Sequence, residues 1–400
     1  MAELNGKKLV LGVTGGIAAY KAAELARLFV KDGVKLTAVL TESGARFVGT
    51  ATFQALTGNP AWSDLWDARM PDNMAHIDLT RGADAIVVAP ASADFLAKLA
   101  HGLADDLLST LCLARDCPLI VAPAMNRQMW ENPATQRNKS QLLQDGVVIL
   151  GPDSGEQACG ETGMGRMLEA EELFQDIVAF FRPKRLAGRR VLITAGPTFE
   201  ALDPVRGLTN LSSGKMGFAL ARAAAEAGAS VTLVAGPAAQ PTPRGVSRID
   251  VVSASDMREA VMQAVGKADI FIGVAAVADY RPSQVAQQKM KKGARAMTVT
   301  LEPNADILAE VAALKKPPFC VGFAAESEKL DEYAEGKRRA KKLPLVVGNL
   351  LQHGLGGDHN TVVLYDDKGR HRLTPAPKLE VARAIIDHIA LLTGANGEQE

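Results

Sequence analysis

Residues 9–21, LVLGVTGGIAAYK, decide the fold of the first half of the chain. Residues 9–13 form a short apolar run of the kind that makes a buried strand, and Gly15 and Gly16 follow it in a turn. A helical apolar pattern then continues to Gly33. A strand, a glycine turn and a helix in this order predict the opening of a nucleotide-binding α/β unit.

The same half contains further apolar runs separated by helical patterns. They consist of Val, Ile, Leu and Ala without polar alternation, which is typical of a parallel sheet covered by helices on both faces. We therefore predict a doubly wound, Rossmann-like domain over residues 1–181. Its remaining strands are expected at residues 35–40, 85–89, 119–122 and 147–150.

A basic, proline-containing stretch, RPKRLAGRR at residues 182–190, is interpreted as a linker. A second strand, glycine turn and helix begin directly after it, with the strand at 191–194 and the helix at about 214–227. Residues 191–400 are thus predicted to form a second α/β domain. Its other strands are expected at residues 231–235, 270–274, 299–301, 320–323, 345–347 and 362–365.

Composition excludes several classes of function. Lys and Arg total 45 against 45 Asp and Glu, so no overall field attracts nucleic acid or an anionic membrane. Four cysteines show neither a CxxC pair nor a metal spacing, which favours a reducing compartment. The chain has no apolar run of about 18 residues and no signal peptide pattern. We expect a soluble, cytoplasmic protein without nucleic-acid or membrane partners.

Residues 158–167, ACGETGMGRM, have too many glycines for regular structure and are expected to form a loop that folds closely over a ligand. Cys159 at its base offers a thiol, and Arg166 at its exit offers an anion-binding fork. A surface loop with an inert thiol is the alternative.

Several polar residues are expected at the carboxyl edge of the first sheet, where such sheets bind ligands. The turn lacks the full GxGxxG spacing, so a mononucleotide phosphate is favoured over a dinucleotide. Ser92 has an alternative role as a helix cap. The predicted cofactor-binding residues are Gly15, Gly16, Ile17, Thr41, Ser92 and Asp94.

His76 and Asn126 complete the motifs of the first half. Alone, His76 fits a structural histidine and Asn126 fits an N-cap. Together, however, the glycine turn, HIDL, PASAD, PAMN and ACGETGMGRM resemble, over nearly all of the first half, the flavin-dependent cysteine decarboxylases. This resemblance implies a flavodoxin-like domain that uses FMN to decarboxylate phosphopantothenoylcysteine through a thioaldehyde.

The resemblance also assigns catalytic roles. Cys159 matches the proton donor to the enethiolate, Asn126 matches the residue that holds the substrate carboxylate, and His76 matches the residue that orients the substrate and assists deprotonation. A thiol with a pKa of about 8.5 is a suitable general acid.

The second half contains NLSSGKMG at residues 210–217, which fails as a Walker A loop because Thr209 and Met216 stand where Gly and Ser or Thr are needed. Its serines and glycine suit either an anion site or a well-capped helix. Asp279 follows a strand, suitably placed to hold magnesium. The KMKKG cluster at residues 289–293 fits a solvated surface or a phosphate-binding loop.

Lys337 and Lys341 lie four residues apart and therefore on one helix face. The helix has acidic residues at its start and basic residues at its end, and this arrangement interacts favourably with the helix dipole. A purely structural role is therefore the alternative for both lysines.

These stretches, with DPVRG, NADIL and GFAAES, resemble the phosphopantothenate–cysteine ligases. The whole chain thus resembles the bacterial bifunctional coenzyme A biosynthesis proteins. The resemblance implies CTP as cosubstrate, Mg²⁺ and an acyl-cytidylate made from 4′-phosphopantothenate. It assigns Asn210 to the activated acyl group and Lys289 to the triphosphate, with Asp279 at the nucleotide or metal. The remaining nucleotide-binding positions are Ala305, Asp306, Ile307, Leu308, Phe323, Lys337 and Lys341.

Three residues depart from the ligase pattern, and two other functions remain as alternatives. Gly207, Leu211 and Ala305 replace a Tyr, a polar or basic residue and a Pro, which affects the expected phosphopantothenate and base contacts. A flavin-binding regulatory protein is one alternative function, against which the presence of Cys159, Asn126 and His76 argues. A nicotinamide-dependent reductase requires a dinucleotide fingerprint that neither half contains. The resemblance further implies homo-oligomers, with trimers of the flavin domain joined by ligase dimers into a dodecamer.

Overall fold

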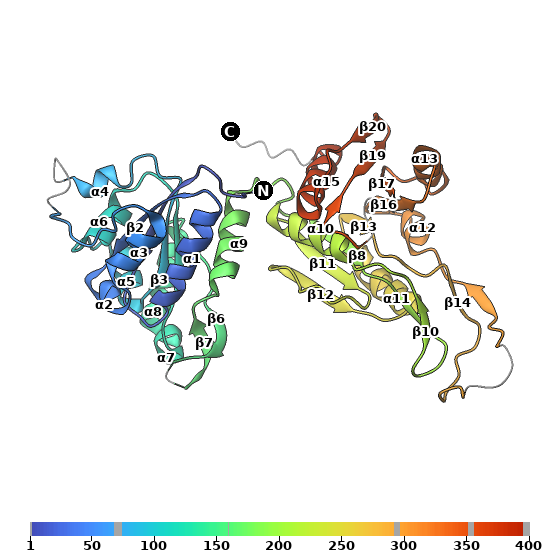
Figure 1. Cartoon of the computed structure of the whole chain (residues 1–400), viewed down its shortest axis with the longest axis horizontal. Helices are drawn as coiled ribbons and strands as arrows, with labels where there is room; N and C mark the ends of the chain where they lie inside the picture. Colours follow the sequence, from blue (N-terminus) through green and yellow to red (C-terminus); the bar gives the residue numbers. More distant parts are fainter. Residues whose placement is uncertain (1, 68–73, 159, 292–296, 351–355, 395–400) are drawn as a thin grey trace. The chain divides into compact units, whose positions relative to one another are not determined.

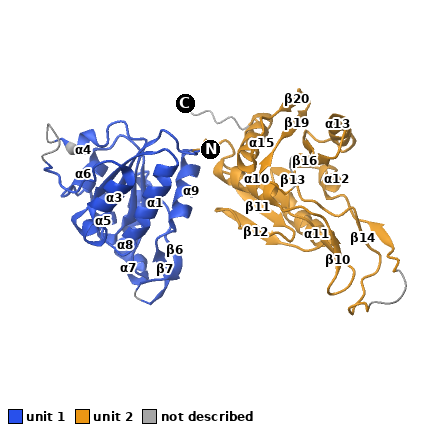
Figure 2. Cartoon of the chain, viewed as in Figure 1, with its two compact units in different colours: residues 1–181 blue, residues 182–400 orange. Residues whose placement is uncertain are grey.

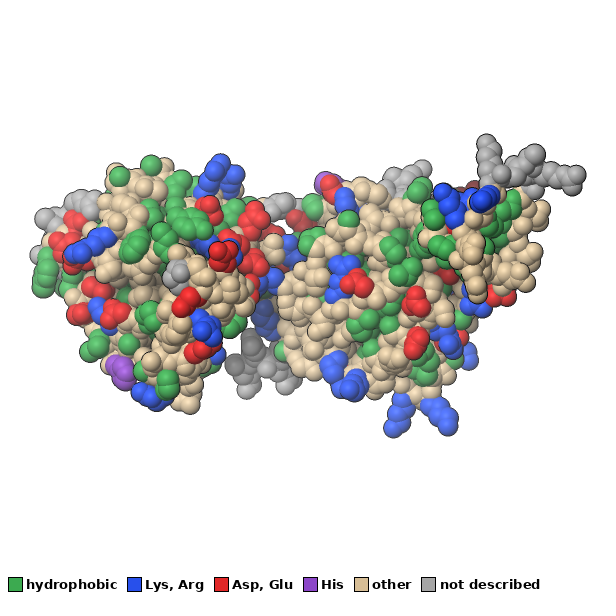
Figure 3. All heavy atoms as spheres, turned by 90° about the horizontal axis from the view of Figure 1, so that it is seen from below, with side chains coloured by type: hydrophobic (Ala, Val, Ile, Leu, Met, Phe, Trp, Pro, Cys, Tyr) green, Lys and Arg blue, Asp and Glu red, His purple; other side chains and the backbone are tan. Residues whose placement is uncertain are grey.

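The computed structural model of the chain describes residues 2–67, 74–158, 160–291, 297–350 and 356–394 (Figure 1). It divides into two compact units, Met1–Phe181 and Arg182–Glu400 (Figure 2). None of the described helices is long and apolar enough to cross a membrane. On the face shown in Figure 3, acidic and basic side chains are interspersed over both units.

The first unit is built on a five-stranded sheet with the order β2-β1-β3-β4-β5. All neighbouring strands in this sheet are parallel. The predicted strands are present, and the mixed α/β fold class is confirmed. The strands are β1 (Lys8–Val13), β2 (Lys35–Leu40), β3 (Ala85–Ala91), β4 (Leu119–Pro123) and β5 (Val148–Ile149).

Both faces of this sheet are covered by helices (Figure 1). One core contains α1 (Ala19–Lys31), α3 (Thr50–Thr57) and α9 (Ala170–Phe181), with Leu11 and Phe29 fully buried in it. The opposite core receives the alternate strand residues, such as Val10. Two buried faces explain why these strands carry no polar alternation. The helices on the opposite face are α5 (Ala93–His101), α6 (Leu107–Ala114) and α8 (Pro133–Gln144). The unit also contains three short helices, α2 (Glu42–Phe47), α4 (Ala75–Asp78) and α7 (Arg127–Glu131).

The glycine-rich stretch that we expected to be irregular is partly a strand. Residues Thr162–Arg166 form β7, which pairs antiparallel with β6 (Asp153–Glu156). The expectation of a loop throughout 158–167 was therefore wrong. Gly163 and Gly165 take φ values of +153° and +134°, so glycine's freedom lets the strand form where other residues would be strained.

The second unit has an eight-stranded sheet with the order β12-β11-β8-β13-β16-β17-β19-β20. Its first six strands run parallel, and β19 and β20 are antiparallel additions at one edge. The strands are β8 (Arg190–Ala195), β11 (Ser230–Ala235), β12 (Val246–Asp250), β13 (Ile270–Gly273), β16 (Phe319–Glu326), β17 (Leu345–Leu350), β19 (Val362–Asp366) and β20 (Gly369–Arg372).

Helices cover this sheet on both faces as well. One core contains α10 (Lys215–Glu226) and α15 (Lys378–Leu392), and the other contains α11 (Ala254–Ala264), α12 (Ile307–Ala312) and α13 (Leu330–Ala340). A 3-10 turn, Val265–Lys267, follows α11. Small antiparallel pairs lie outside the main sheet: β9 (Phe199–Ala201) with β10 (Gly207–Thr209), β14 (Tyr280–Pro282) with β15 (Leu301–Pro303), and β18 (His359–Asn360) with β21 (Ala376–Pro377).

Residues 182–190, which the sequence marks as a linker, pack on the second unit. Leu186 is fully buried in the core that contains α10, and its N–H donates to the carbonyl of Ala227 at 2.8 Å. The ammonium of Lys184 donates to the carbonyl of Glu226 at 2.9 Å. These contacts fix the start of β8 and explain why the division between the units falls after Phe181.

Candidate active sites

The glycine turn after β1 is tied to the end of β3. The hydroxyl of Thr14 donates to the carbonyl of Pro90 at 2.8 Å and accepts the N–H of Ser92 at 3.0 Å. Thr14 is buried, so these bonds hold the turn and the PASAD segment at one sheet edge. Sequence analysis missed this role because a threonine in a turn carries no distinctive signal.

Glycine is required in this turn for two different reasons. A Cβ on Gly15 would lie 2.6 Å from the Cβ of Ser43, which begins the neighbouring α2 region, so only glycine allows this approach. Gly16 has a φ of +156° and would direct a Cβ into open space. Ile17, next in the chain, is 62% exposed. The edge beside the turn is therefore open to a ligand.

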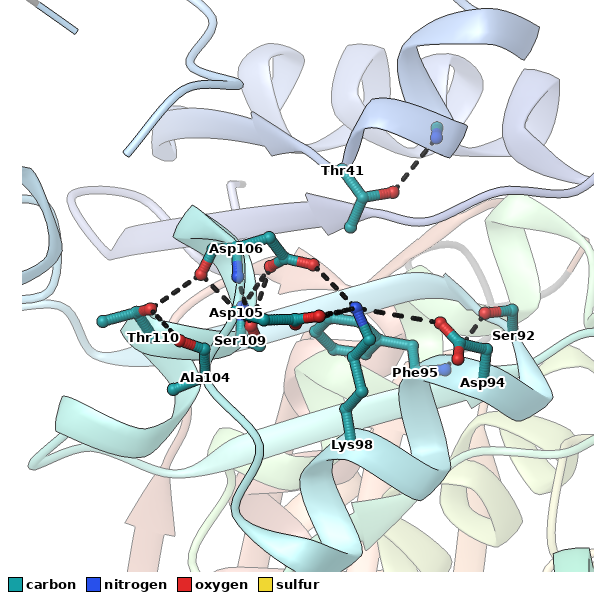
Figure 4. Close-up of polar contacts among 11 residues, drawn as sticks. Thr41, Ser92, Asp94, Phe95, Lys98, Ala104, Asp105, Asp106, Ser109 and Thr110 are labelled. Carbon is teal, nitrogen blue, oxygen red and sulfur yellow. Dashed lines mark hydrogen bonds and ion pairs between the residues drawn. The ribbon is translucent and has the colours of Figure 1, made fainter. Parts of the chain in front are cut away.

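Thr41 and Ser92 both cap helices at this edge. The hydroxyl of Thr41 accepts the N–H of Gly44 at 3.0 Å, and that of Ser92 accepts the N–H of Phe95 at 3.2 Å (Figure 4). The capping alternative for Ser92 is thus present in the structure. Because a hydroxyl that accepts one bond still has its own proton to donate, a capping residue can also bind a ligand oxygen.

Asp94 lies on the first turn of α5 beside a cation that the sequence did not indicate. The ammonium of Lys98 lies 2.8 Å from Asp105, 3.4 Å from Asp106 and 3.9 Å from Asp94 (Figure 4). The hydrogen bond to Asp105 is the largest cause that raises the pKa of Lys98. Asp94 is its most distant partner and remains largely exposed, so its carboxylate is accessible to a ligand.

Asn126 follows β4 and begins a chain of side-chain amides. Its carbonyl oxygen accepts the N–H of Met129 at 3.0 Å, which makes it the N-cap of α7. Its amide nitrogen donates to Gln128 at 2.8 Å, and Gln128 donates to Glu161 at 2.9 Å. The second oxygen of the Glu161 carboxylate is buried and has no hydrogen-bond partner in the part of the chain that the structure describes. This series of side-chain hydrogen bonds connects Asn126 to Glu161 of the glycine-rich stretch and so fixes the orientation of the Asn126 amide.

The hairpin of β6 and β7 packs closely on the same segment. A Cβ on Gly163 would lie 2.3 Å from the Cδ of Arg127, and one on Gly165 would lie 2.4 Å from the carbonyl oxygen of Met125. The N–H of Met125 donates to the carbonyl of Gly165 at 3.0 Å. The glycines therefore allow this strand to lie directly against the loop that carries Asn126. Cys159 lies outside the described residues.

His76 lies on α4, and its Nδ1 atom is buried with no hydrogen-bond partner among the described residues. Among the described residues, no hydrogen bond joins His76 to Asn126. A structural histidine normally pairs its buried nitrogens, so the unpaired Nδ1 favours a ligand over the purely structural alternative.

The second unit contains a cavity of about 490 Å³ between the sheet edge and α12 and α13. The predicted nucleotide-binding positions converge on it, whereas Asn210 and Lys289 do not line it. Thr194 and Asn304, which sequence analysis did not select, also line it. The predicted residues in its wall are Asp279, Ala305, Asp306, Ile307, Leu308, Phe323, Lys337 and Lys341.

Charged groups at one wall of this cavity are paired. Lys341 forms an ion pair with Asp306, which also caps α12 through the N–H of Ala309 at 2.9 Å. Burial opposes ionisation of Asp306, but these two interactions lower its pKa below the usual value. Lys337 donates to the carbonyl of Phe323 at 2.5 Å, and its burial lowers its pKa. An anionic ligand would relieve this unfavourable burial of a cation.

Asn304 holds the strand end that carries Asp279. Its amide nitrogen donates to the carbonyl of Ala278 at 2.9 Å, and its backbone N–H donates to the carbonyl of Asp279 at 2.8 Å. The amide oxygen of Asn304 is buried and accepts no hydrogen bond from any described residue. The Asp279 side chain is exposed at this wall, where a cation bound to a nucleotide has access to it.

Asn210 contacts the wall of the cavity, and Lys289 lies on a separate segment. The amide of Asn210 donates to the carbonyl of Ala276, a cavity residue, at 2.5 Å. Lys289 is exposed, and the next residue, Met290, is held through its backbone by Asp203 at 3.1 Å and Arg206 at 2.6 Å. The rest of the KMKKG cluster lies largely outside the described residues.

The start of α10 differs from the alternative of a well-capped helix. Its N-cap is Gly214, with φ of +74° and no capping side chain. Ser212 accepts only the N–H of Gly214, at 3.4 Å. Because the first N–H groups of a helix lack intrahelical partners, this uncapped start favours the anion-binding alternative for NLSSGKMG.

Comparisons with known proteins cover both units. Residues 1–182 match the family described as Flavoprotein, and residues 186–392 match the DNA/pantothenate metabolism flavoprotein C-terminal domain. The coenzyme A biosynthesis bifunctional protein CoaBC of Vibrio cholerae is 49% identical over 392 residues, covering 96% of this chain and 98% of that protein. The chain belongs to this family of bifunctional coenzyme A biosynthesis proteins.

Other members of the family are similarly close. The protein of the same name from Haemophilus influenzae is 48% identical and covers 97% of this chain and 98% of its own length. That of Bacillus subtilis is 44% identical and covers 99% of this chain and 100% of its own length. The chain is thus a bifunctional enzyme of coenzyme A biosynthesis with a flavoprotein unit, which confirms the predicted family and function.

Proposed function

We propose that the chain catalyses two consecutive reactions of coenzyme A biosynthesis. A ligase activity joins 4′-phosphopantothenate to cysteine through an acyl-cytidylate made from CTP. A decarboxylase activity then converts phosphopantothenoylcysteine to 4′-phosphopantetheine. The observation that carries this proposal is the match to bifunctional relatives over 96% to 99% of the chain, which includes both units.

We assign one activity to each unit, with residues 1–181 as the decarboxylase, 182–190 as the connection and 191–400 as the ligase. The family matches, at residues 1–182 and 186–392, support this division. Each unit also has polar residues at the carboxyl edge of its own parallel sheet, where ligands of such folds bind.

In the first unit, FMN is the flavin that fits the open edge beside the glycine turn. Gly15, Gly16 and Ile17 would approach the phosphate or ribityl chain, and the hydroxyls of Thr41 and Ser92 retain protons to donate. Asp94 is the remaining residue that we propose to bind the flavin. When bound, the flavin supplies the two-electron oxidation and the return of those electrons.

The protein groups of the decarboxylase hold the substrate and move its protons. Asn126, oriented by Gln128 and Glu161, donates its amide to the substrate carboxylate. His76, with its unpaired Nδ1, orients the substrate and assists deprotonation. Cys159 is the general acid that protonates the enethiolate after CO₂ has left. A hydride and a proton then restore the saturated product, so the reaction needs no external reductant.

In the second unit, the cavity of about 490 Å³ is the CTP site. Lys337 and Lys341 lie in its wall as cations for the phosphates, and Asp279 is the carboxylate that would hold Mg²⁺. Asn210, bonded to the cavity residue Ala276, contacts the activated acyl group. Lys289 neutralises the triphosphate when its segment lies over the nucleotide. The cysteine amine then displaces CMP.

The test of the proposed function combines two measurements on the purified full chain. Its visible absorption spectrum should show bound flavin, and incubation with phosphopantothenate, cysteine, CTP and Mg²⁺ should yield CMP, CO₂ and 4′-phosphopantetheine. A protein that binds flavin but forms none of these three products would instead support the regulatory alternative.

Two further properties are proposed on the family resemblance. We propose a homo-oligomer in which trimers of the first unit are joined by dimers of the second, and size-exclusion chromatography with light scattering tests it. We also propose a cytoplasmic location, with which the free thiols of Cys112, Cys117 and Cys320 agree.

A further inference from the structure

Three side chains with metal-binding atoms meet at the antiparallel edge of the second sheet. Asp366 is the last residue of β19, His371 lies on β20, and His388 lies on α15, three elements that are neighbours in Figure 1. The ligand atoms of the three residues all lie within 4.8 Å of one another. Neither the proposed function nor the family matches give these residues a role.

The two imidazoles converge on one buried carboxylate. The Nε2 atom of His371 lies 3.2 Å from Oδ1 of Asp366, and the Nε2 atom of His388 lies 2.8 Å from Oδ2. The ring centroids are 4.8 Å apart. The Asp366 side chain is 1% exposed, whereas that of His371 is 38% exposed. The cluster is therefore anchored inside the unit and accessible from outside.

We propose that Asp366, His371 and His388 form a binding site for a divalent transition-metal ion, with Zn²⁺ as the expected occupant. Zinc bonds to histidine nitrogen and carboxylate oxygen are about 2.0–2.2 Å long, which sets neighbouring ligand atoms in a tetrahedron about 3.3 Å apart. The observed nitrogen–oxygen separations of 3.2 and 2.8 Å are below this value, and the three ligand atoms lie within 4.8 Å of one another, so shifts of the imidazoles would bring all three onto one ion. Two imidazoles and one carboxylate suit Zn²⁺ and disfavour Mg²⁺, which prefers oxygen ligands.

The carboxylate is held in place by the turn between β19 and β20. The backbone N–H groups of Lys368 and Gly369 donate to its Oδ1 atom at 2.8 and 3.1 Å. Such outer hydrogen bonds orient a ligand before the metal arrives. The fourth coordination position is left to water, with entry on the side of His371. Each histidine binds the metal as the neutral tautomer with its proton on Nδ1, so the proton that bridges Nε2 and the carboxylate moves to Nδ1 or, from an imidazolium, is released to solvent.

The site is separate from the nucleotide cavity. In the sheet, β17 stands between β16, which lines the cavity, and β19. A metal here would join the β19–β20 hairpin to α15 and stabilise this edge of the unit. Its occupancy can therefore be tested without reference to the two catalytic reactions.

The test measures Zn²⁺ binding by the full chain in competition with a chromophoric chelator, with excess Mg²⁺ present. The double variant His371→Gln/His388→Gln should bind one equivalent of Zn²⁺ less than the wild type. Each single variant should weaken that equivalent at least ~10-fold, because even loss of an outer hydrogen-bond partner weakens metal sites by about 10–100-fold. His359→Gln, an exposed histidine of the same unit, is the matched control and should bind like the wild type.

Co²⁺ provides the second readout. It should give visible absorption bands in the wild type that are absent from the double variant, and circular dichroism checks that each variant is folded. If the double variant does not fold, the exposed single variant His371→Gln decides. Equal Zn²⁺ stoichiometry and affinity in wild type and His371→Gln, or no Zn²⁺ bound at this site by the wild type, would overturn the proposal and leave a hydrogen-bonded cluster only.

Discussion

In the first unit the selected polar residues cap helices, whereas in the second unit most of them line a cavity. Thr41, Ser92 and Asn126 each accept a backbone N–H at the start of a helix. In the second unit only Asp306 does so. The residues that we propose to bind the flavin and the substrate therefore also hold the local fold, so a simple truncation there confounds the two roles.

The second unit separates the two roles more clearly. Its cavity is formed by whole elements, and the partly buried cation Lys337 donates to a backbone carbonyl. Partial desolvation of an ammonium is unfavourable, and a bound anion would offset it. Substitutions in the cavity should therefore change ligand binding more than stability, in contrast to the caps of the first unit.

The largest expected effect is at Cys159, whose proposed role is chemical and not structural. In Cys159→Ser the hydroxyl is roughly isosteric but a far weaker acid, so the late protonation fails. Loss of a general acid typically slows a reaction by about 10²–10⁴-fold. We expect one release of CO₂, a flavin that stays reduced and an accumulated enethiol. Single-turnover CO₂ release and flavin absorbance measure these outcomes. Wild-type turnover, or a flavin never reduced despite bound substrate, would remove this role.

Asn126 allows capping and catalysis to be separated. Both Asn126→Ala and Asn126→Asp lose the amide donor, and we expect decarboxylation to fall by about 10²–10³-fold, as for loss of other positioned donors. Because aspartate caps as well as asparagine, only the alanine variant should lose stability, by about 1 kcal/mol. CO₂ release and thermal unfolding measure the two effects. An active Asn126→Asp enzyme would show that the amide only caps α7.

Two substitutions of Ser92 separate helix capping from flavin binding in the same way. Ser92→Ala should cost about 1 kcal/mol of folding stability and bind flavin more weakly. Ser92→Asp keeps the cap but places a negative charge beside the proposed phosphate position, so it should lose flavin while keeping its unfolding temperature. The absorbance ratio of flavin to protein after purification measures retention. Full flavin content in Ser92→Asp would mean that the phosphate lies elsewhere.

The smallest effect concerns Asp203, which accepts the backbone N–H of Met290, the residue after Lys289. Hydrogen bonds from Arg206, and from backbone N–H groups including that of Met290, lower the pKa of Asp203. Its ionised form thus stabilises the fold above its unfolded pKa of about 3.9, and this contribution is lost as pH falls through the lower folded pKa. The difference in unfolding temperature between wild type and Asp203→Asn should narrow mainly below about pH 4.

The control for this experiment is Asp250→Asn, which changes an exposed carboxylate of the same unit. Its unfolding temperature should follow the wild type throughout the pH range. A difference for Asp203→Asn that stays constant down to pH 3 would show that its ionisation is not coupled to folding.

Continuous apolar strands made the fold predictable from sequence. Residues 85–89 are buried throughout, and residues 38–40 of the edge strand β2 are buried as well, so their apolar composition alone indicated a covered parallel sheet. The edge strand β12 was not predicted, because its sequence, VSRID, is mostly polar. The hairpin strand β7 was not predicted, because a glycine-rich strand lacks an alternating side-chain pattern. Its conformation also depends on close packing against Arg127.

The candidate sites were predictable where a motif carries the residue. Resemblance selected eight residues that line one cavity, although they come from separate segments of the chain. Thr14 and Asn304 were not selected as site residues, because their roles depend on partners distant in the sequence, and Lys98 was not selected because its nearby acidic partners form no recognised motif. Such relationships exist only once the chain has folded.

The most direct test of the central claim, that each unit carries one activity, compares two full-length variants in both half-reactions. Lys289→Gln should abolish CMP release from phosphopantothenate, cysteine and CTP while decarboxylating supplied phosphopantothenoylcysteine at the wild-type rate. Asn126→Asp should show the reverse pattern. If either variant, folded by circular dichroism, loses both activities, the two sites are not independent and the assignment of one activity to each unit is wrong.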